Sequence, residues 1–284
     1  MNAIAKPLAQ GWSATLDLEF AARGGRTVLA RNRHQGPLRV QRPFYPETGG
    51  QAHVYVLHPP GGIVAGDSLA IDIDVAVGAH GLVTTPSAGR VYRSNAQGLL
   101  QTQQVTMTVA EGGFGEWLPQ ENIVFNGARA WNQTRIQLAP GARFIGWEIT
   151  CLGRPASAQW FDQGSLCQSW WLERAGKPLL LEKSRFDGGS ELLQAAWGLQ
   201  GHPTLGTMVC TLEDPALESE LKALCAGLRS PGLVLEVTQL PQLLVVRAQA
   251  PQAAAVNQAF FAVWHRLRKA LLGVPAVAPR IWFT

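Results

Sequence analysis

Carboxylates that stand among apolar residues are the side chains of this sequence best suited to chemistry. Asp67 ends a segment, His58 to Asp67, in which two prolines fix φ and three glycines permit conformations closed to other residues. Glu148 lies in the apolar run Phe144–Cys151, and Glu182 follows three consecutive leucines. A buried carboxylate must be ion-paired, hydrogen-bonded, neutralised or placed beside water or a cation. These three acids are therefore the candidate site residues.

Two interpretations of each candidate stay open. For Asp67, the alternatives are a purely structural turn and a carboxylate that lines a polar path. For Glu148 and Glu182, strand alternation can turn the side chain outward to solvent or inward into an internal acidic track. Oxygen ligands that leave water in place hold a divalent cation loosely, which suits passage rather than storage.

The remaining reactive residues lack the spacing of known sites. The six histidines never stand at i, i+4 or as His-x-His, and the four cysteines form no Cys-x-x-Cys pair. Neither a Gly-x-Ser-x-Gly motif nor the Lys-Ser/Thr of a phosphate-binding loop is present. We therefore expect no catalytic activity, no nucleotide site and no tightly bound cofactor. An all-β enzyme acting on an acidic or metal-bound substrate is the alternative function.

Composition narrows the class of protein further. With 46% hydrophobic and 15% charged residues, the chain has much to bury, as a large β core or a member of a complex would. Its net charge of +4 is scattered, which argues against nucleic-acid binding. Lys6-Pro7 interrupts the start, and no 18-residue apolar segment occurs. We expect a soluble, cytoplasmic protein with free thiols and neither signal peptide nor membrane span.

The elements that must position these acids are mostly strands. Residues 14 to 20 alternate between polar and apolar side chains, which is the period of a half-buried strand. Similar runs, separated by glycine or proline, predict strands at Ala14–Phe20, Thr27–Arg33, His53–His58, Leu69–Val75, Gly81–Thr85, Leu99–Val109, Phe114–Leu118, Arg135–Leu138, Phe144–Cys151 and Ser169–Glu173. Many short strands indicate a sandwich, a barrel or a β-solenoid.

The last third of the chain predicts an α-β-β-α unit. Asp214-Pro215 supplies an N-cap and a first-turn proline for a helix over Ala216–Leu228. Strands over Leu233–Gln239 and Leu243–Ala248 follow, and an amphipathic stripe predicts a second helix over Gln252–Leu272. This unit could be a small lobe on the β body.

The chain ends in Pro279-Arg280-Ile281-Trp282-Phe283-Thr284, after a proline-broken linker. Such a tail either docks on its own body or anchors a partner. We expect it to dock, because exposed tryptophan and phenylalanine pairs aggregate.

Five segments together resemble the UreD family of urease accessory proteins, also called UreH. They are His58 to Asp67, Val40 to Glu47, Arg90 to Ser94, Glu116 to Phe125 and the C-terminal tail. The likeness extends from Gly11 to Thr284, and these motifs are long and unusual enough to be specific.

The resemblance implies a fold and a role. Members are mainly β, with a many-stranded superhelical body and two helices. We accordingly expect a single domain over residues 1–284, with a solenoid-like β body at about 11–210 and the helix-containing part at about 211–284. Members are non-enzymatic scaffolds that join a UreF-type helical protein and a UreG-type GTPase, bind apo-urease and assist nickel delivery.

The resemblance also assigns roles to the three acids. In this family, carboxylates at the positions of Asp67, Glu148 and Glu182 have been placed along an internal, water-filled nickel passage. This chain departs from the family at Ala65, often glycine, and at Arg90-Val91, often Lys-Phe. The scattered histidines and cysteines argue against the further alternative, a nickel-storage protein.

Overall fold

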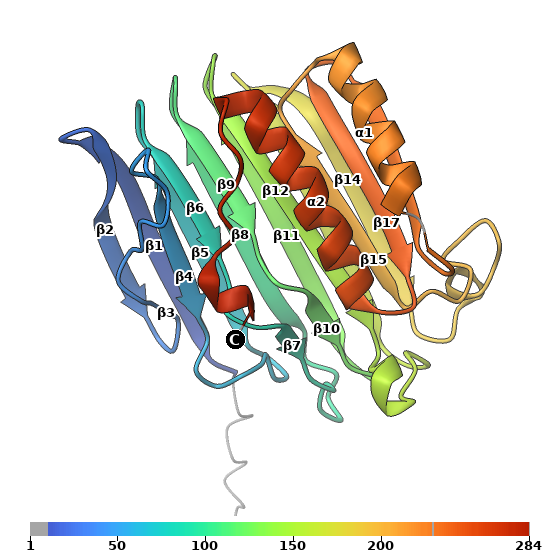
Figure 1. The fold of residues 1–284 in the computed structure, drawn as a ribbon. Helices are drawn as coiled ribbons and strands as arrows, with labels where there is room; N and C mark the ends of the chain where they lie inside the picture. The colour runs from blue at the N-terminus through green and yellow to red at the C-terminus, as the bar shows by residue number, and fades with distance from the viewer. Residues whose placement is uncertain (1–10, 229, 284) are drawn as a thin grey trace, which may run out of the picture.

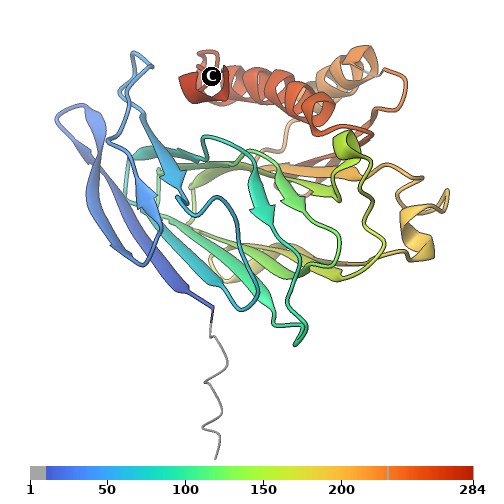
Figure 2. The same cartoon turned by 90° about the horizontal axis from the view of Figure 1, so that it is seen from below.

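Two facing β-sheets form the body of the protein, and two helices cover the outer side of one of them (Figures 1 and 2). The computed structural model describes residues 11–228 and 230–283, so the Lys6-Pro7 pair and Thr284 lie outside the described residues. None of the helices in these ranges combines the length and apolar character that crossing a membrane requires.

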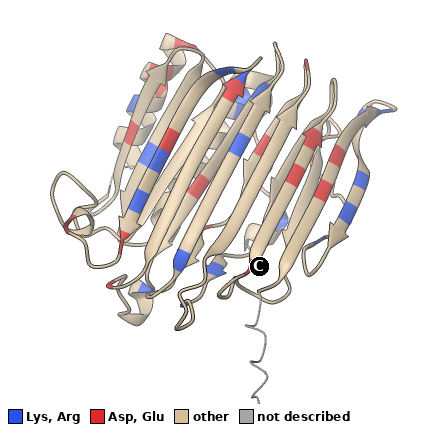
Figure 3. Cartoon of the chain, turned by 180° about the vertical axis from the view of Figure 1, so that it is seen from behind, with Lys and Arg blue, Asp and Glu red and all other residues tan. Residues whose placement is uncertain are grey.

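The first sheet has seven strands in the spatial order β14-β13-β11-β8-β5-β1-β2. Their bounds are β1 Ser13–Arg23, β2 Arg26–Gln35, β5 Ser68–Val75, β8 Gln101–Val109, β11 Arg129–Leu138, β13 Ser165–Arg174 and β14 Lys177–Asp187. Its outer face carries neither α-helix, as Figure 3 shows. The first sheet therefore buries its side chains mainly on the inner face, which is turned toward the second sheet.

The second sheet has ten strands, in the order β16-β17-β15-β12-β9-β6-β4-β3, with β10 paired to β12 and to β7. Their bounds are β3 Arg39–Val40, β4 Ala52–Leu57, β6 His80–Thr84, β7 Gly89–Val91, β9 Phe114–Leu118, β10 Asn122–Val124, β12 Arg143–Leu152, β15 Thr204–Cys210, β16 Val234–Leu240 and β17 Leu243–Ala250. Helices α1 (Pro215–Leu228) and α2 (Ala253–Leu272) pack on its outer face.

From β4 to β13 the chain passes back and forth between the two sheets. The strands β1, β5, β8, β11 and β13 are parallel neighbours in the first sheet. The strands β4, β6, β9 and β12, which lie between them in sequence, are parallel neighbours in the second. Each sheet is thus assembled from segments that are distant in sequence, and side chains from both sheets meet in the space between them.

Side-chain alternation explains two separate cores. Ala14, Leu16, Leu18 and Phe20 of β1 point into the core between the sheets. Strands of the second sheet are buried on both faces, as the five buried residues of β9 show. Their second face packs against the helices in another core, where Trp147 meets Phe260 and Trp264 of α2.

The C-terminal elements agree with the sequence-based expectation, but they are not a separate lobe. Asp214 caps α1, because its Oδ1 accepts hydrogen bonds from the backbone of Ala216 and Leu217 at 3.0 and 3.1 Å. The strands β16 and β17 extend the second sheet beyond β15. The α-β-β-α unit is therefore built into the body.

The C-terminal tail docks on the body, as expected. Trp282, in a short 3-10 helix (η3, Arg280–Phe283), donates its indole N–H to Thr84 Oγ1 at 2.9 Å. Its ring packs against Trp147 and Trp264. Docking does not bury the whole tail, because Phe283 is 75% exposed. Trp282 is therefore the anchor of the tail.

The mainly β class with two C-terminal helices is confirmed. The single domain and the solenoid-like description of the body stay predictions. The strands β3, β7, β10, β14 and β15 had not been predicted. The first three have only two or three residues, while Lys and Arg in β14 and Gly206 in β15 weaken the alternation of those strands.

Candidate functional site: a polar cavity between the sheets

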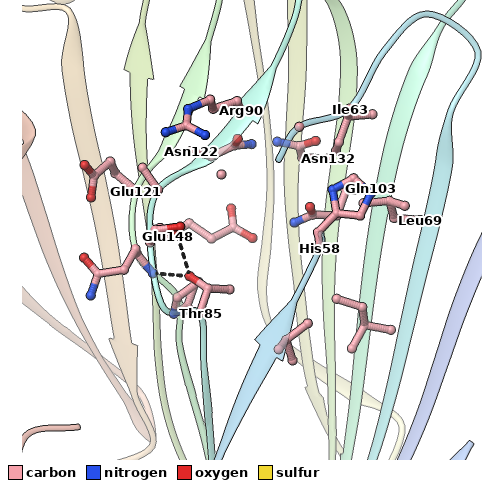
Figure 4. A pocket seen from close by; sticks show the side chains of 18 of the residues that line it. His58, Ile63, Leu69, Thr85, Arg90, Gln103, Glu121, Asn122, Asn132 and Glu148 are labelled. Atoms are coloured by element: carbon pink, nitrogen blue, oxygen red, sulfur yellow. Dashed lines mark hydrogen bonds between the residues drawn. The ribbon is translucent and has the colours of Figure 1, made fainter. Parts of the chain in front are cut away.

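A cavity of about 450 Å³ lies between the two sheets and opens to the surface. Figure 4 shows Glu148 at its centre, with Arg90, Asn122, Asn132 and His58 around it. The polar residues that line it are His58, Thr85, Ser87, Arg90, Gln103, Gln120, Glu121, Asn122, Asn132, Gln133, Thr134, Glu148 and Thr150. The rest of the lining is mainly apolar, with Leu38, Ile71 and Trp117 among it, and apolar atoms make up most of the cavity surface. A space between two sheets is normally filled by apolar side chains, so the polar groups are the unusual part of this lining.

Glu148 is held in place by side chains of the opposite sheet. It lies on β12, and its two carboxylate oxygens accept hydrogen bonds from Thr134 Oγ1 of β11 and from Gln168 Nε2 of β13. The Thr150 hydroxyl donates to Gln168 Oε1 at 3.0 Å and so orients the amide. The structure therefore answers one open question: Glu148 points inward, into the cavity.

Burial raises the pKa of Glu148 to about 7. The hydrogen bonds from Thr134 and Gln168 oppose this shift, and the nearby charge of Glu182 adds to it. The carboxyl group is therefore about half ionised near neutral pH. A cation that enters the cavity favours the ionised form and displaces the proton.

Two amides in the cavity wall retain free hydrogen-bonding capacity. Asn132 is buried, yet its Oδ1 has no hydrogen-bond partner among the described residues, and neither has Asn122 Nδ2. Unsatisfied buried polar atoms are costly unless water or an ion reaches them. Asn132 Oδ1 can accept a hydrogen bond from water or ligate a cation, whereas Asn122 Nδ2 is a donor and can only bond to water or another acceptor.

Glu182 also points inward, but it is ion-paired. It lies on β14 and reaches across to Arg247 of β17, with the two oxygens 2.9 and 2.5 Å from the guanidinium nitrogens. The hydrogen bonds that Arg247 donates to the Glu182 carboxylate raise the pKa of Arg247. The Glu182 side chain is 25% exposed and does not line the cavity, and its charge adds to the raised pKa of Glu148.

Asp67 stands apart from the other two acids and does not line the cavity. It is buried, and each of its oxygens accepts one backbone hydrogen bond, from Trp12 at 2.8 Å and from Val64 at 2.9 Å. The carboxylate thus fastens the segment directly before β1 to the turn that precedes β5. Its position fits the structural alternative, and a part in metal passage stays a prediction.

A second group of buried charges lies on the other side of the second sheet, beneath α2. Arg268 of α2, which is wholly buried, forms ion pairs with Glu47 and with Glu116 of β9. His80 Nε2 and Trp264 Nε1 lie 2.8 and 2.7 Å from Glu116 oxygens. Burial alone raises the pKa of Glu116, but the Arg268 charge and these contacts together lower it to about 2.

The side chains that bind metal ions most strongly are scattered in the structure. Within the two described ranges, no group of three or more His, Cys, Asp or Glu side chains is placed to hold a metal ion. Sequence reasoning found Glu148 by its apolar neighbours but missed Thr134, Gln168 and Asn132. Their only signal is that polar residues recur at inward positions of β11 and β13.

Comparison with known proteins identifies the family of the chain. The family model described as UreD urease accessory protein matches residues 13–283. A urease accessory protein UreD of Pseudomonas putida strain W619 is 45% identical over 274 residues, covering 96% of this chain and 95% of the relative. Relatives of the same name from Alcanivorax borkumensis and Hahella chejuensis are 43% and 39% identical, each covering 97% of this chain and 93% and 92% of the relative. The chain therefore belongs to the UreD family of urease accessory proteins.

Proposed function

We propose that this protein assists urease maturation as a non-catalytic scaffold through which nickel passes on its way to apo-urease. The observation that carries the proposal is the polar cavity between the sheets, with Glu148 at its centre. Nickel is the cargo in this proposal. The partners are those implied by the family: a UreF-type helical protein, a UreG-type GTPase and apo-urease, in the cytoplasm.

The donor set of the cavity suits a cation in transit. Carboxylate, amide and hydroxyl oxygens are hard ligands, and a site that keeps water in place binds weakly enough to release its ion. Two carboxylates line the cavity, those of Glu148 and Glu121, and neither forms an ion pair with a cation of the described residues. The Glu121 carboxylate accepts a hydrogen bond from Asn257 of α2, whereas that of Glu148 is held by Thr134 and Gln168. A divalent ion therefore gains attraction there without a complete ligand shell.

The acid Glu182 adds little to the attraction between Glu148 and a divalent ion. Its pairing with Arg247 leaves that region with little net charge. A second free carboxylate beside Glu148 would hold a divalent ion more tightly and slow its release. The pair thus supports a passage that guides the ion without trapping it.

The test is urease activation with the variant Glu148→Gln in a reconstituted system of apo-urease, the accessory proteins and nickel. We expect the complex to assemble normally, while the nickel content and activity of urease fall at limiting nickel. The matched control is Glu111→Gln, which removes the same charge from an exposed turn.

Normal nickel content with Glu148→Gln would overturn the passage through this cavity. Loss of assembly with the same variant would assign Glu148 a structural part instead. Turnover of a substrate by the chain alone would favour the enzyme alternative.

A further inference from the structure

We infer that a second pocket, formed by two loops that cross between the sheets, is a binding site for a guanidinium group. The pocket has a volume of about 210 Å³. It lies between residues 153–164, which connect β12 to β13, and residues 188–203, which connect β14 to β15. Among the described residues, none lines both this pocket and the cavity that contains Glu148. The two sites are therefore distinct.

The volume of this pocket limits the size of its occupant. Pockets that bind cofactors or drug-sized molecules usually measure about 300–1,000 Å³. A nucleotide or a ligand of similar size is therefore too large. The pocket is still several times larger than the share of one water molecule in the liquid, which is about 30 Å³. It can therefore hold a group of the size of one side chain.

The wall of the pocket contains hydrogen-bond acceptors that lack a donor. Ser190 Oγ and His202 Nδ1 are buried atoms without a hydrogen-bond partner among the described residues. The Asp162 carboxylate likewise forms neither a hydrogen bond nor an ion pair within the described part of the chain. A hydroxyl oxygen, a neutral imidazole nitrogen and a carboxylate can all accept hydrogen bonds. An occupant with several N–H groups would satisfy all three.

The charge of the lining favours a cation. Within the described ranges the lining includes the carboxylate of Asp162 but no lysine, arginine or glutamate. Asn126 Oδ1 accepts the backbone N–H groups of Asp162 and Gln163 at 3.1 and 2.8 Å. The backbone that carries the carboxylate is therefore fixed, while the negative charge has no cation beside it.

An aromatic side chain completes the lining and narrows the kind of cation. Trp160 is 52% exposed and lines the pocket. Cations are attracted to the face of an aromatic ring, and tryptophan attracts them most strongly. A guanidinium group is planar, stacks on such a ring and has five N–H donors, whereas an ammonium group is a compact charge with three. The lining therefore favours guanidinium over ammonium.

The two loops are fastened to each other within the protein itself. The Gly189 N–H donates to the Phe161 carbonyl group at 2.9 Å. A Cβ atom at Gly188 would lie 2.4 Å from the backbone nitrogen of Gln163, so only glycine permits the loops to approach this closely. A pocket that is organised in advance loses little conformational entropy when its ligand binds.

Two sources can supply the same guanidinium group: a small free guanidine and the arginine side chain of another protein. Either source would bring the planar cation to Asp162 and Trp160. The inference does not depend on the passage of nickel, because the pocket and the cavity have no lining residue in common among those described.

The test is isothermal titration calorimetry of the full chain with N-ethylguanidinium. The matched probe is N-ethylurea, which has nearly the same shape but no charge. We expect a Kd of about 1 mM or lower for ethylguanidinium and binding at least about tenfold weaker for ethylurea. The peptide acetyl-Gly-Arg-Gly-amide separates the sources. Tighter binding of the peptide than of ethylguanidinium would assign the pocket to an arginine side chain, and weaker binding would assign it to a free guanidine.

Two pairs of variants locate the site. Asp162→Asn and Trp160→Ala should each weaken the binding of ethylguanidinium about tenfold. Their controls, Glu191→Gln and Trp197→Ala, change the same kinds of side chain on these loops but outside the lining, and should leave the Kd unchanged. All four side chains are exposed, so the variants should fold, which the unfolding midpoint of each one checks.

Equal affinity for ethylguanidinium and ethylurea would overturn the inference, since charge would then have no part in recognition. Wild-type affinity of Asp162→Asn would overturn it as well, and so would equal losses with the two control variants. Glu148→Gln should bind ethylguanidinium as the wild type does. A failure of nickel passage would therefore not be mistaken for a failure of this site.

Discussion

Replacing Glu148 by glutamine should stabilise the protein at alkaline pH while it impairs nickel transfer. The pKa of this carboxyl group is raised from 4.5 to about 7, chiefly by burial. The folded protein therefore binds the proton more tightly than the unfolded chain does. Glutamine keeps the size of the side chain and can hydrogen-bond both Thr134 and Gln168. It differs mainly in having no charge to bury.

The sign and the size of the effect follow from proton linkage. As pH rises from 4.5 to 7, the unfolded chain ionises Glu148 before the folded protein does, so the wild type loses stability through this window. The full loss corresponds to about 3 kcal/mol at pH 8, and water in the cavity can only reduce it. Glu148→Gln should thus gain at most about 3 kcal/mol at pH 8 and almost nothing at pH 4.

The assay is denaturant unfolding of both proteins from pH 4 to pH 8. Glu116→Gln is an informative control, because Glu116 lies on the neighbouring strand β9 and its pKa is lowered to about 2. Its ionised form is the stabilising one above pH 4.5, and this contribution is lost as pH falls toward 2. Glu116→Gln should therefore cost about 3 kcal/mol throughout the pH range of the assay. A stability difference for Glu148→Gln that stays flat between pH 4 and pH 8 would refute the reasoning.

Three further perturbations have defined outcomes. Deleting Arg280 to Thr284 should lower the melting temperature, since Trp282 is partly buried and full burial of a large apolar side chain, the upper limit here, contributes about 1.5–3 kcal/mol; an unchanged melting temperature with lost partner binding would show that the tail is an interface instead. Asp67→Ala should destabilise the protein by about 1–3 kcal/mol in chemical unfolding, because two backbone N–H groups lose their acceptor; an unchanged unfolding midpoint would contradict the structural part of this carboxylate. Glu182→Ala should cost less than about 1 kcal/mol, because the Arg247 side chain is 52% exposed and can reach water; a melting temperature several degrees lower would show that the pair is structural.

Local patterns in the sequence predicted the elements well. Alternation in β1 and the Asp214-Pro215 pair before α1 act within a few residues, so no knowledge of the tertiary fold was needed. The assignment of strands to sheets could not be predicted in the same way. It depends on pairings such as β1 with β5, whose partners are separated by about fifty residues.

The candidate site was predictable only in part, for the same reason. Glu148 stood out because apolar residues surround it in sequence. Thr134 and Gln168 look like ordinary strand residues, and only the facing of β11 and β13 against β12 brings them to Glu148. Arg268 was not singled out in the predicted helix, and its pairing with Glu116 requires a contact across 152 positions.

The two ion pairs of Arg268 have a consequence for synthesis of the chain. Its partners Glu47 and Glu116 precede it by 221 and 152 residues. At about 5–20 residues per second, Glu116 exists for about 8–30 s before its cation has been made. Until then Glu47 and Glu116 lack their arginine and have only His53 and His80 as partners, and the sheet beneath α2 lacks its apolar cover. The nascent protein therefore cannot complete its fold strand by strand, because the fold depends on α2. Any ribosomal pause after β17 prolongs the exposure of the sheet surface that α2 covers in the folded protein.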